Sequence, residues 1–98
     1  MNAISKVSDI TAADLAEYIR LPDPDANDLQ MLENLFSVSK NFILQYTGQN
    51  DLDAFQDFVI CVFVLVQDMW DNRSLYVDKS NLNEVISRIL DMHAVNLL

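Results

Sequence analysis

Apolar residues along this chain recur at intervals of three and four positions, which is the period of an α-helix. One Gly and two Pro among 98 residues leave few points at which helices would be interrupted. We therefore predict an all-α fold in which a single small domain, residues 1–98, contains four helices. In chain order they are short, long, long and strongly apolar, and short, with a loop before the last. The apolar stripes place them within residues 11–21, 23–47, 51–71 and 81–92.

The first two helices carry signals at their ends. Thr11 followed three residues later by Asp14 resembles a capping box, in which each residue bonds the other's backbone amide. Pro22 should end the first helix, because proline lacks an amide donor and disfavours helical angles in its predecessor. Gly48, the only glycine, directly follows the second stripe and predicts a left-handed C-terminal cap.

The later helices have similar signals. Asp51 or Asp53 is the predicted cap of the third helix. The stretch from Asn72 to Ser80 has no helical pattern and is predicted to be a loop. Asn81, with Glu84 three residues later, is the predicted start of the fourth helix.

The charge balance is strongly acidic and limits the possible functions. Fifteen Asp and Glu oppose six Lys and Arg, which gives a formal net charge of −9. Binding to nucleic acid depends on cations that replace the counterions of the phosphates, and this chain offers few. Sequence-specific recognition of nucleic acid is therefore not expected.

Cys61 is the only cysteine, so neither an intramolecular disulfide nor a cysteine-based zinc site is expected. It lies within the longest apolar run, Phe58 to Val66, where a buried structural thiol is the ordinary interpretation. That run is about half the length needed to span a bilayer, and the N-terminus lacks the pattern of a signal peptide. We expect a soluble protein that is intracellular when it is made.

One segment partly matches a calcium-binding loop. Asp23, Asp25 and Asn27 occupy the first three ligand positions. However, Asp28 stands where the loop requires Gly, and Asn34 stands where it requires a bidentate Glu. Capping of the second helix by Asp23 or Asp25 explains the same residues, so we predict no metal site.

The remaining residues offer no catalytic pattern. His93 is the only histidine, and the nearby Asp91 is two residues away, off its face of a helix, so a peripheral helix-end histidine is predicted. Ser74 has neither a neighbouring histidine nor the surroundings of a nucleophile elbow. We predict that the protein is not an enzyme and has no cofactor. Two acidic pairs are attributed to solvated helix starts and faces: Asp51 with Asp53, and Asp68 with Asp71.

Two features near the end of the third helix point to contacts with another molecule. Trp70 and Arg73 end this helix with an aromatic residue and a cation that the helix dipole favours. A core tryptophan with a helix-terminal arginine would give the same pattern. Beyond them Leu75, Tyr76 and Val77 are three consecutive apolar residues outside any predicted core.

The order of these landmarks resembles the bacteriophage head–tail connector family, often described as phage DNA-packaging proteins. That family begins with a short helix, followed by an acidic turn and a long helix that closes on Tyr-Thr-Gly. An apolar helix comes next and ends in an aromatic residue followed by Asp or Glu, Asn and Arg. A short aliphatic helix ends the domain. The family usually has a proline before its third helix, which this chain lacks. The corresponding segments here are Ile10–Leu21, Pro22–Asp28, Tyr46–Gly48, Trp70–Arg73 and Val85–Met92.

The resemblance implies a structural virion protein located at the head–tail junction and present in the host cytoplasm during assembly. Such subunits form a homo-oligomeric ring, commonly of about twelve copies, that docks on the portal protein and provides a platform for a tail or stopper protein. DNA passes through the ring without being recognised. An acidic lumen would suit this passage, because it offers no cations to hold the phosphates.

The features at the end of the third helix and the resemblance to connectors together suggest which residues contact other proteins. The first group is the patch at the end of the third helix, for contacts with other subunits or with the portal. The second group is the apolar C-terminal segment from Ala94, which ends in two leucines. The residues are Trp70, Arg73, Leu75, Tyr76, Val77, Leu97 and Leu98.

Two other classes of protein fit parts of the pattern. An acidic helical adaptor or inhibitor that binds a basic protein, or that mimics DNA, would explain the charge. A carrier protein would also be small, acidic and helical, but it needs a modifiable serine after Asp at a helix start. Ser74 instead follows Arg73 and leads into the predicted loop.

Overall fold

A computed structural model describes residues 4–95 and confirms the all-α prediction. Within these residues there are four α-helices and no strand. The α-helices are α1 (Ala12–Tyr18), α2 (Ala26–Thr47), α3 (Asp57–Asn72) and α4 (Glu84–Met92). Three short 3-10 helices accompany them: η1 (Val7–Asp9), η2 (Leu52–Ala54) and η3 (Lys79–Asn81).

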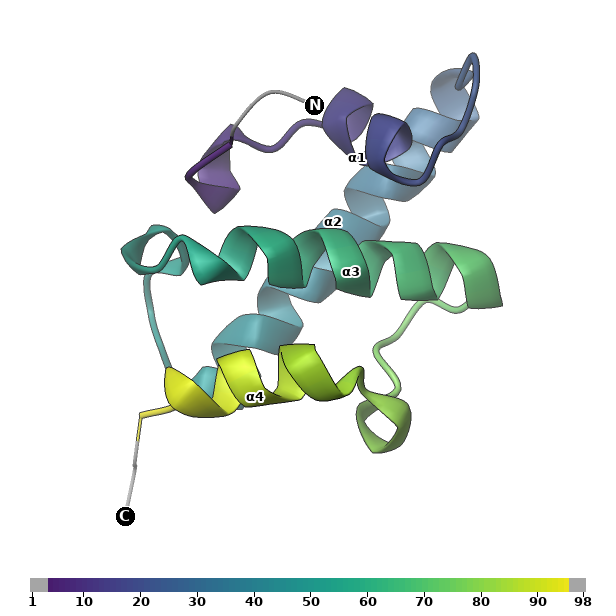
Figure 1. Ribbon diagram of the computed structural model, residues 1–98. Helices are drawn as coiled ribbons and strands as arrows, with labels where there is room; N and C mark the ends of the chain where they lie inside the picture. Colours follow the sequence, from purple (N-terminus) through teal and green to yellow (C-terminus); the bar gives the residue numbers. More distant parts are fainter. Residues whose placement is uncertain (1–3, 96–98) are drawn as a thin grey trace.

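The central helix is α3, as its apolar sequence predicts. It crosses α2, while α1 and η1 lie along one side of it and α4 lies along the other (Figure 1). Phe58, Val62 and Val66 on α3 are completely shielded from solvent. The tilted pair of Tyr18 and Phe63, with ring centroids 4.9 Å apart, joins α3 to α1. The other helices contribute six buried aliphatic residues to this core: Leu15, Leu32, Leu35, Ile43, Ile86 and Leu90.

The predicted caps of the first two helices are largely confirmed. Thr11 and Asp14 form a reciprocal capping box. Asp25, rather than Asp23, caps α2, and its partner is Asp28. Asp25 of the incomplete calcium motif thus accepts a bond from a helix amide. Gly48 ends α2 in the left-handed conformation, with φ 72°.

The first helix ends earlier than Pro22 alone requires. Arg20 adopts a left-handed conformation, with φ 59°. Its amide donates to the carbonyl of Glu17, and the amide of Leu21 donates to the carbonyl of Ala16. These two bonds form a Schellman motif, which closes α1 before the proline is reached.

The predicted start of the third helix is wrong by several residues. Asp51 caps η2 instead, by accepting a bond from the amide of Asp53. The Asp53 carboxylate in turn accepts the amide of Ser8 at 3.0 Å, which ties η2 to η1. Phe55 is extended, and α3 begins only at Asp57, without a side-chain cap.

The start of the fourth helix is also displaced. Asn83, not Asn81, caps α4 by accepting bonds from the amides of Val85 and Ile86. Asn81 instead donates to the carboxylate of Asp78 at 2.8 Å and belongs to η3. The predicted loop is therefore shorter, because its last part folds into this 3-10 turn.

Burial of α3 predicts a large difference between two identical substitutions. Val62→Ala removes two buried methyl groups and should lower the free energy of unfolding by about 2 kcal/mol. Val85→Ala, at a position that is 63% exposed on α4, should change it by less than about 0.5 kcal/mol. Urea unfolding followed by circular dichroism measures both values. Equal effects would contradict the assignment of the core.

Candidate interaction site at the end of the central helix

The predicted contact residues cluster where α3 ends in a second Schellman motif. The amide of Ser74 donates to the carbonyl of Met69, and the amide of Arg73 donates to the carbonyl of Trp70. Arg73 itself is left-handed, with φ 53°. Glycine is the favoured residue at such a position, and a side chain there costs about 1 kcal/mol. The chain thus keeps an arginine where the backbone alone would favour glycine.

The side chain of Arg73 lies against the aromatic residue of the preceding turn. Its guanidinium carbon is 5.1 Å from the centroid of the Trp70 ring. A cation over an aromatic face at this distance contributes about 0.5–1 kcal/mol at an exposed site. The contact fixes the direction of a flexible exposed side chain, and it leaves the nitrogen donors of Arg73 at the protein surface.

Trp70 and Arg73 form part of the wall of an apolar groove between α2 and the end of α3. The groove has a volume of about 200 Å³. Trp70 is half-buried, whereas Leu75 at the rim is 62% exposed. Apart from Arg73 and one serine the lining is apolar: Met31, Leu35, Met69, Trp70, Arg73, Ser74 and Leu75.

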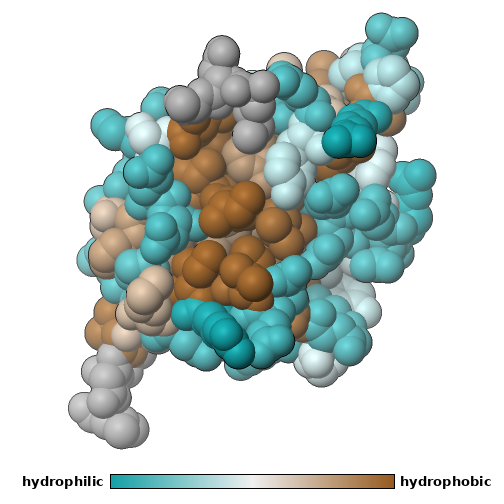
Figure 2. Space-filling view, in the orientation of Figure 1, coloured by the Kyte–Doolittle hydropathy of each residue, from teal (hydrophilic) through white to brown (hydrophobic). Residues whose placement is uncertain are grey.

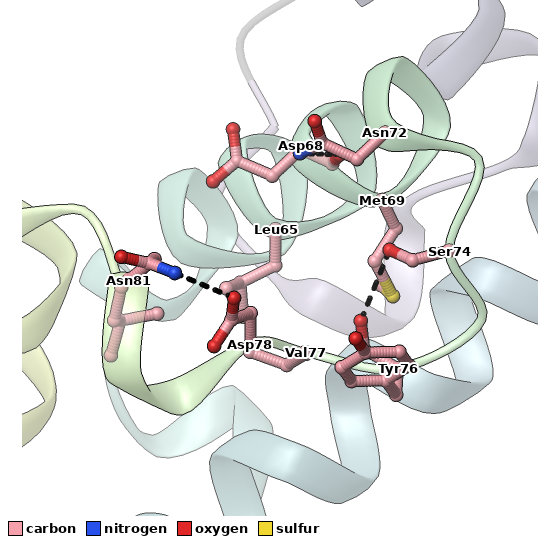
Figure 3. A pocket seen from close by; sticks show the side chains of 10 residues that line it. Leu65, Asp68, Met69, Asn72, Ser74, Tyr76, Val77, Asp78 and Asn81 are labelled. Carbon is pink, nitrogen blue, oxygen red and sulfur yellow. Dashed lines mark hydrogen bonds between the residues drawn. The ribbon is translucent and has the colours of Figure 1, made fainter.

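The loop after α3 also lines a smaller cavity of about 70 Å³ (Figure 3). Met69 and Ser74 line both spaces. Leu65 and Met69 point from α3 toward the loop. Val77 packs against the core, while Tyr76 is 66% exposed. The predicted run of three exposed apolar residues is therefore divided, with Leu75 and Tyr76 outward and Val77 partly inward.

Polar contacts hold the far end of the loop in place. The Asp78 carboxylate accepts bonds from the side-chain amide of Asn81 and from the hydroxyl and backbone amide of Ser80. These bonds, with that of Asn81 the strongest cause, hold the pKa of Asp78 below its ordinary value. The hydroxyl of Ser74 donates to the carbonyl of Tyr76 at 3.3 Å. Ser74 thus orders the loop.

The acidic pair at the end of α3 has no counterion. Within the described residues, neither Asp68 nor Asp71 has a cationic group within ion-pair distance. Partial burial and, secondarily, the negative charge of Asp71 raise the pKa of Asp68. The last turn of a helix also disfavours negative charge, because the helix dipole has its negative end there.

The structure corrects the prediction of a peripheral His93. Its side chain is only 14% exposed, and its Nε2 lies 3.0 Å from the carboxylate of Asp57. Its ring stacks on Phe55, with centroids 3.9 Å apart, and packs edge-on against Phe58. The neighbouring Asp91 instead accepts the hydroxyl of Tyr46 at 2.6 Å. His93 therefore fastens the end of α4 to the start of α3.

Cys61 is confirmed as a buried thiol. Burial, and to a smaller extent the charge of Asp57, raises the pKa of Cys61 to about 12. A thiol that keeps its proton is a poor nucleophile and a poor metal ligand. Among residues 4–95 no three His, Cys, Asp or Glu side chains converge as metal ligands, and no helix is long and apolar enough to cross a membrane. Leu97 and Leu98 lie outside the described residues.

Comparisons with known proteins add no further constraint. No family model, no curated protein and no solved structure matches this chain. The interpretation of the exposed groove and loop therefore rests on their geometry alone.

The opposed environments of two carboxyl groups predict their order of titration. Asp68, with its raised pKa, should take up a proton at a higher pH than Asp78, with its lowered pKa. The stabilisation that Asp78 contributes is present above the ordinary aspartate pKa and is lost as the pH falls through its lowered pKa. Carboxyl carbon NMR on the labelled protein follows both groups. The reverse order of titration would contradict the partial burial of Asp68 and the hydrogen bonds of Asp78.

The two left-handed arginines form a matched pair for substitution. Arg20→Gly should raise the free energy of unfolding by about 1 kcal/mol, because glycine relieves the positive φ. Arg73→Gly should raise it by about 0.5 kcal/mol, because the contact with Trp70 is lost at the same time. Urea unfolding of both variants tests this expectation. A lower free energy of unfolding for Arg20→Gly would show that the positive φ of Arg20 does not strain the backbone.

Proposed function

We propose that the protein is a structural virion subunit, a head–tail connector that assembles as a ring and docks on a phage portal. The observation that supports this proposal most is the end of α3. Arg73 occupies an unfavourable backbone position and lies on Trp70 beside an open apolar groove. Strain that persists in a fold is a reason to look for a function of the strained residue.

The groove and the loop have the chemistry of a protein–protein contact. Trp and Arg are the residue types that contribute most to binding energy at interfaces. Leu75 and Tyr76 add exposed apolar area next to them, although apolar surface of this kind costs free energy in water. In a ring, these residues would bury that surface against a neighbouring subunit or the portal.

The charge of the chain agrees with a conduit for DNA. A net charge of −9 repels phosphates, so DNA would slide past such a subunit without being held. Like charges also oppose association of free subunits before the portal is present. In this proposal the ring extends the channel of the portal and carries the tail or stopper protein.

Light-scattering mass after size exclusion, with the protein alone and with its cognate portal ring, tests the proposal. A closed ring, or a stoichiometric complex with the portal, would support the connector. A monomer or dimer that ignores the portal would overturn it. In that case the acidic adaptor that binds a basic protein would become the better explanation of the charge.

A double variant tests whether the end of α3 makes the contact. Arg73→Glu with Tyr76→Ala should abolish incorporation into the portal complex, because it reverses the cation and removes the exposed ring. Helicity should stay unchanged, since both side chains are exposed. Lys6→Glu makes the same charge change at an exposed position outside the groove, and it should leave incorporation intact. Normal incorporation of the double variant would exclude this contact.

A further inference from the structure

A second apolar surface lies on the outer side of α3 and α4, away from the groove. We call it the α3–α4 face, and Figure 2 shows apolar surface gathered over this part of the molecule with polar residues around it. Three of its residues are large and exposed, with Ile60 at 43%, Val85 at 63% and Met92 at 67%. Two half-buried residues lie between them in the helical pattern. The face consists of Ile60, Val64, Val85, Ile89 and Met92.

Helical spacing places these residues on continuous stripes. Val85, Ile89 and Met92 follow one another at four and three positions along α4, so they share one side of it. The side of α4 toward α2 is a different one, since Asp91 there bonds Tyr46 of α2. Ile60 and Val64, four positions apart, share one side of α3, and α3 runs beside α4 (Figure 1).

The core explains why the side of α3 that carries Ile60 and Val64 is the exposed one. Residues on both sides of the stripe, such as Cys61 and Phe63, are buried under the neighbouring helices. Ile60 and Val64 are thus apolar residues on a side of α3 that contacts water. Polar residues would fit there at no cost to the core, so the apolar choice indicates a further contact.

Charged residues at the border determine which partner fits. Asp57 precedes the α3 stripe, and Asp68 and Asp71 follow it. Asp57 is paired with His93, whereas the other two lack a counterion within the described residues. The one arginine of α4, Arg88, is bonded to Glu84 at 2.6 Å. Among the described residues, α3 and α4 therefore offer carboxylates beside the stripes, and their one arginine is already paired.

A second copy of this chain is a poor occupant for this face. Two copies would bring the same uncompensated carboxylates together, and each chain carries a net charge of −9. A cationic partner would supply the counterions that Asp68 and Asp71 lack. It would also offset the repulsion that these residues experience at the negative end of the α3 dipole.

We propose that the α3–α4 face binds an amphipathic helix of another protein, with an apolar stripe and flanking Lys or Arg residues. The stripe of α4 extends over eight residues, from Val85 to Met92. Its ends are about 10 Å apart along the axis, which corresponds to two turns of a bound helix. Two adjacent helices with apolar outer sides form the kind of surface on which a third helix packs. The proposal does not depend on the connector function, because the face is separate from the groove at the end of α3.

A pair of synthetic helical peptides tests the proposal on the full chain. Both carry leucines at a spacing of four and three, and one is flanked by lysines while the other is flanked by glutamates. In NMR titrations of the labelled protein, the lysine peptide should shift the amides of Ile60, Val64, Val85, Ile89 and Met92. The glutamate peptide should cause no such shifts. Added salt should weaken the binding of the lysine peptide.

Variants separate the apolar contribution from the charged one. Asp68→Asn with Asp71→Asn should weaken binding of the lysine peptide about fivefold, as the loss of two exposed ion pairs would. Ile60→Ser with Val85→Ser should abolish it. Two controls should leave it unchanged: Glu33→Gln removes a charge on α2, and Leu75→Ser removes apolar surface at the groove.

Three results would overturn the proposal. Equal binding of both peptides would show that charge does not select the partner. Shifts confined to the groove residues, such as Met31 and Leu75, would place the binding elsewhere. Concentration-dependent shifts of the face without any peptide would identify a second copy as the occupant. None of these results bears on the assembly with a portal.

Discussion

Burial of α3 is the interaction on which the rest of the structure depends. Eight of its sixteen residues are buried, and they contact each of the other three α-helices. Burial of a large aliphatic or aromatic side chain contributes about 1.5–3 kcal/mol, so a chain of this size obtains much of its stability from this one helix. The other α-helices are arranged around it, and each buries part of its surface against it or against its neighbours. Only one narrow stripe of α3, at Ile60 and Val64, and its C-terminal end remain outside the core.

Local sequence was sufficient to predict the helices and some of their ends. The capping box of α1 and the left-handed Gly48 after α2 are confirmed, and Asp25 is one of the two caps that the sequence offered for α2. The starts of α3 and α4 were misplaced for a physical reason. Several aspartates and asparagines lie near each start, and any of them can cap a helix. Near α4, Asn81 bonds Asp78 and leaves Asn83 as the cap. Near α3, Asp53 is engaged by a distant residue, since it accepts a bond from Ser8, 45 residues away. Such a contact leaves no periodic signal in the sequence.

The site was predictable only in part, for the same reason. The sequence indicated Trp70, Arg73 and the apolar residues of the loop, but not that Met31 and Leu35 of α2 complete a groove with them. It gave no sign that Arg73 is left-handed, because arginine rarely adopts this conformation. His93 appeared isolated since its partner, Asp57, is 36 residues away. In each case the missing information was the packing of one helix against another.

The two surfaces left by the core differ in chemistry, and this difference argues for two different contacts. The groove at the end of α3 has a cation fixed on an aromatic ring, so it suits a partner that offers acceptors and an apolar side chain. At the border of the α3–α4 face, Asp68 and Asp71 have no cationic group of the described residues within ion-pair distance, so this face suits a cationic partner. Both meet at α3, whose last turn carries Asp68 and Asp71 as well as Trp70. A ligand on one surface would therefore alter the electrostatic field at the other, and a single rigid helix connects the two.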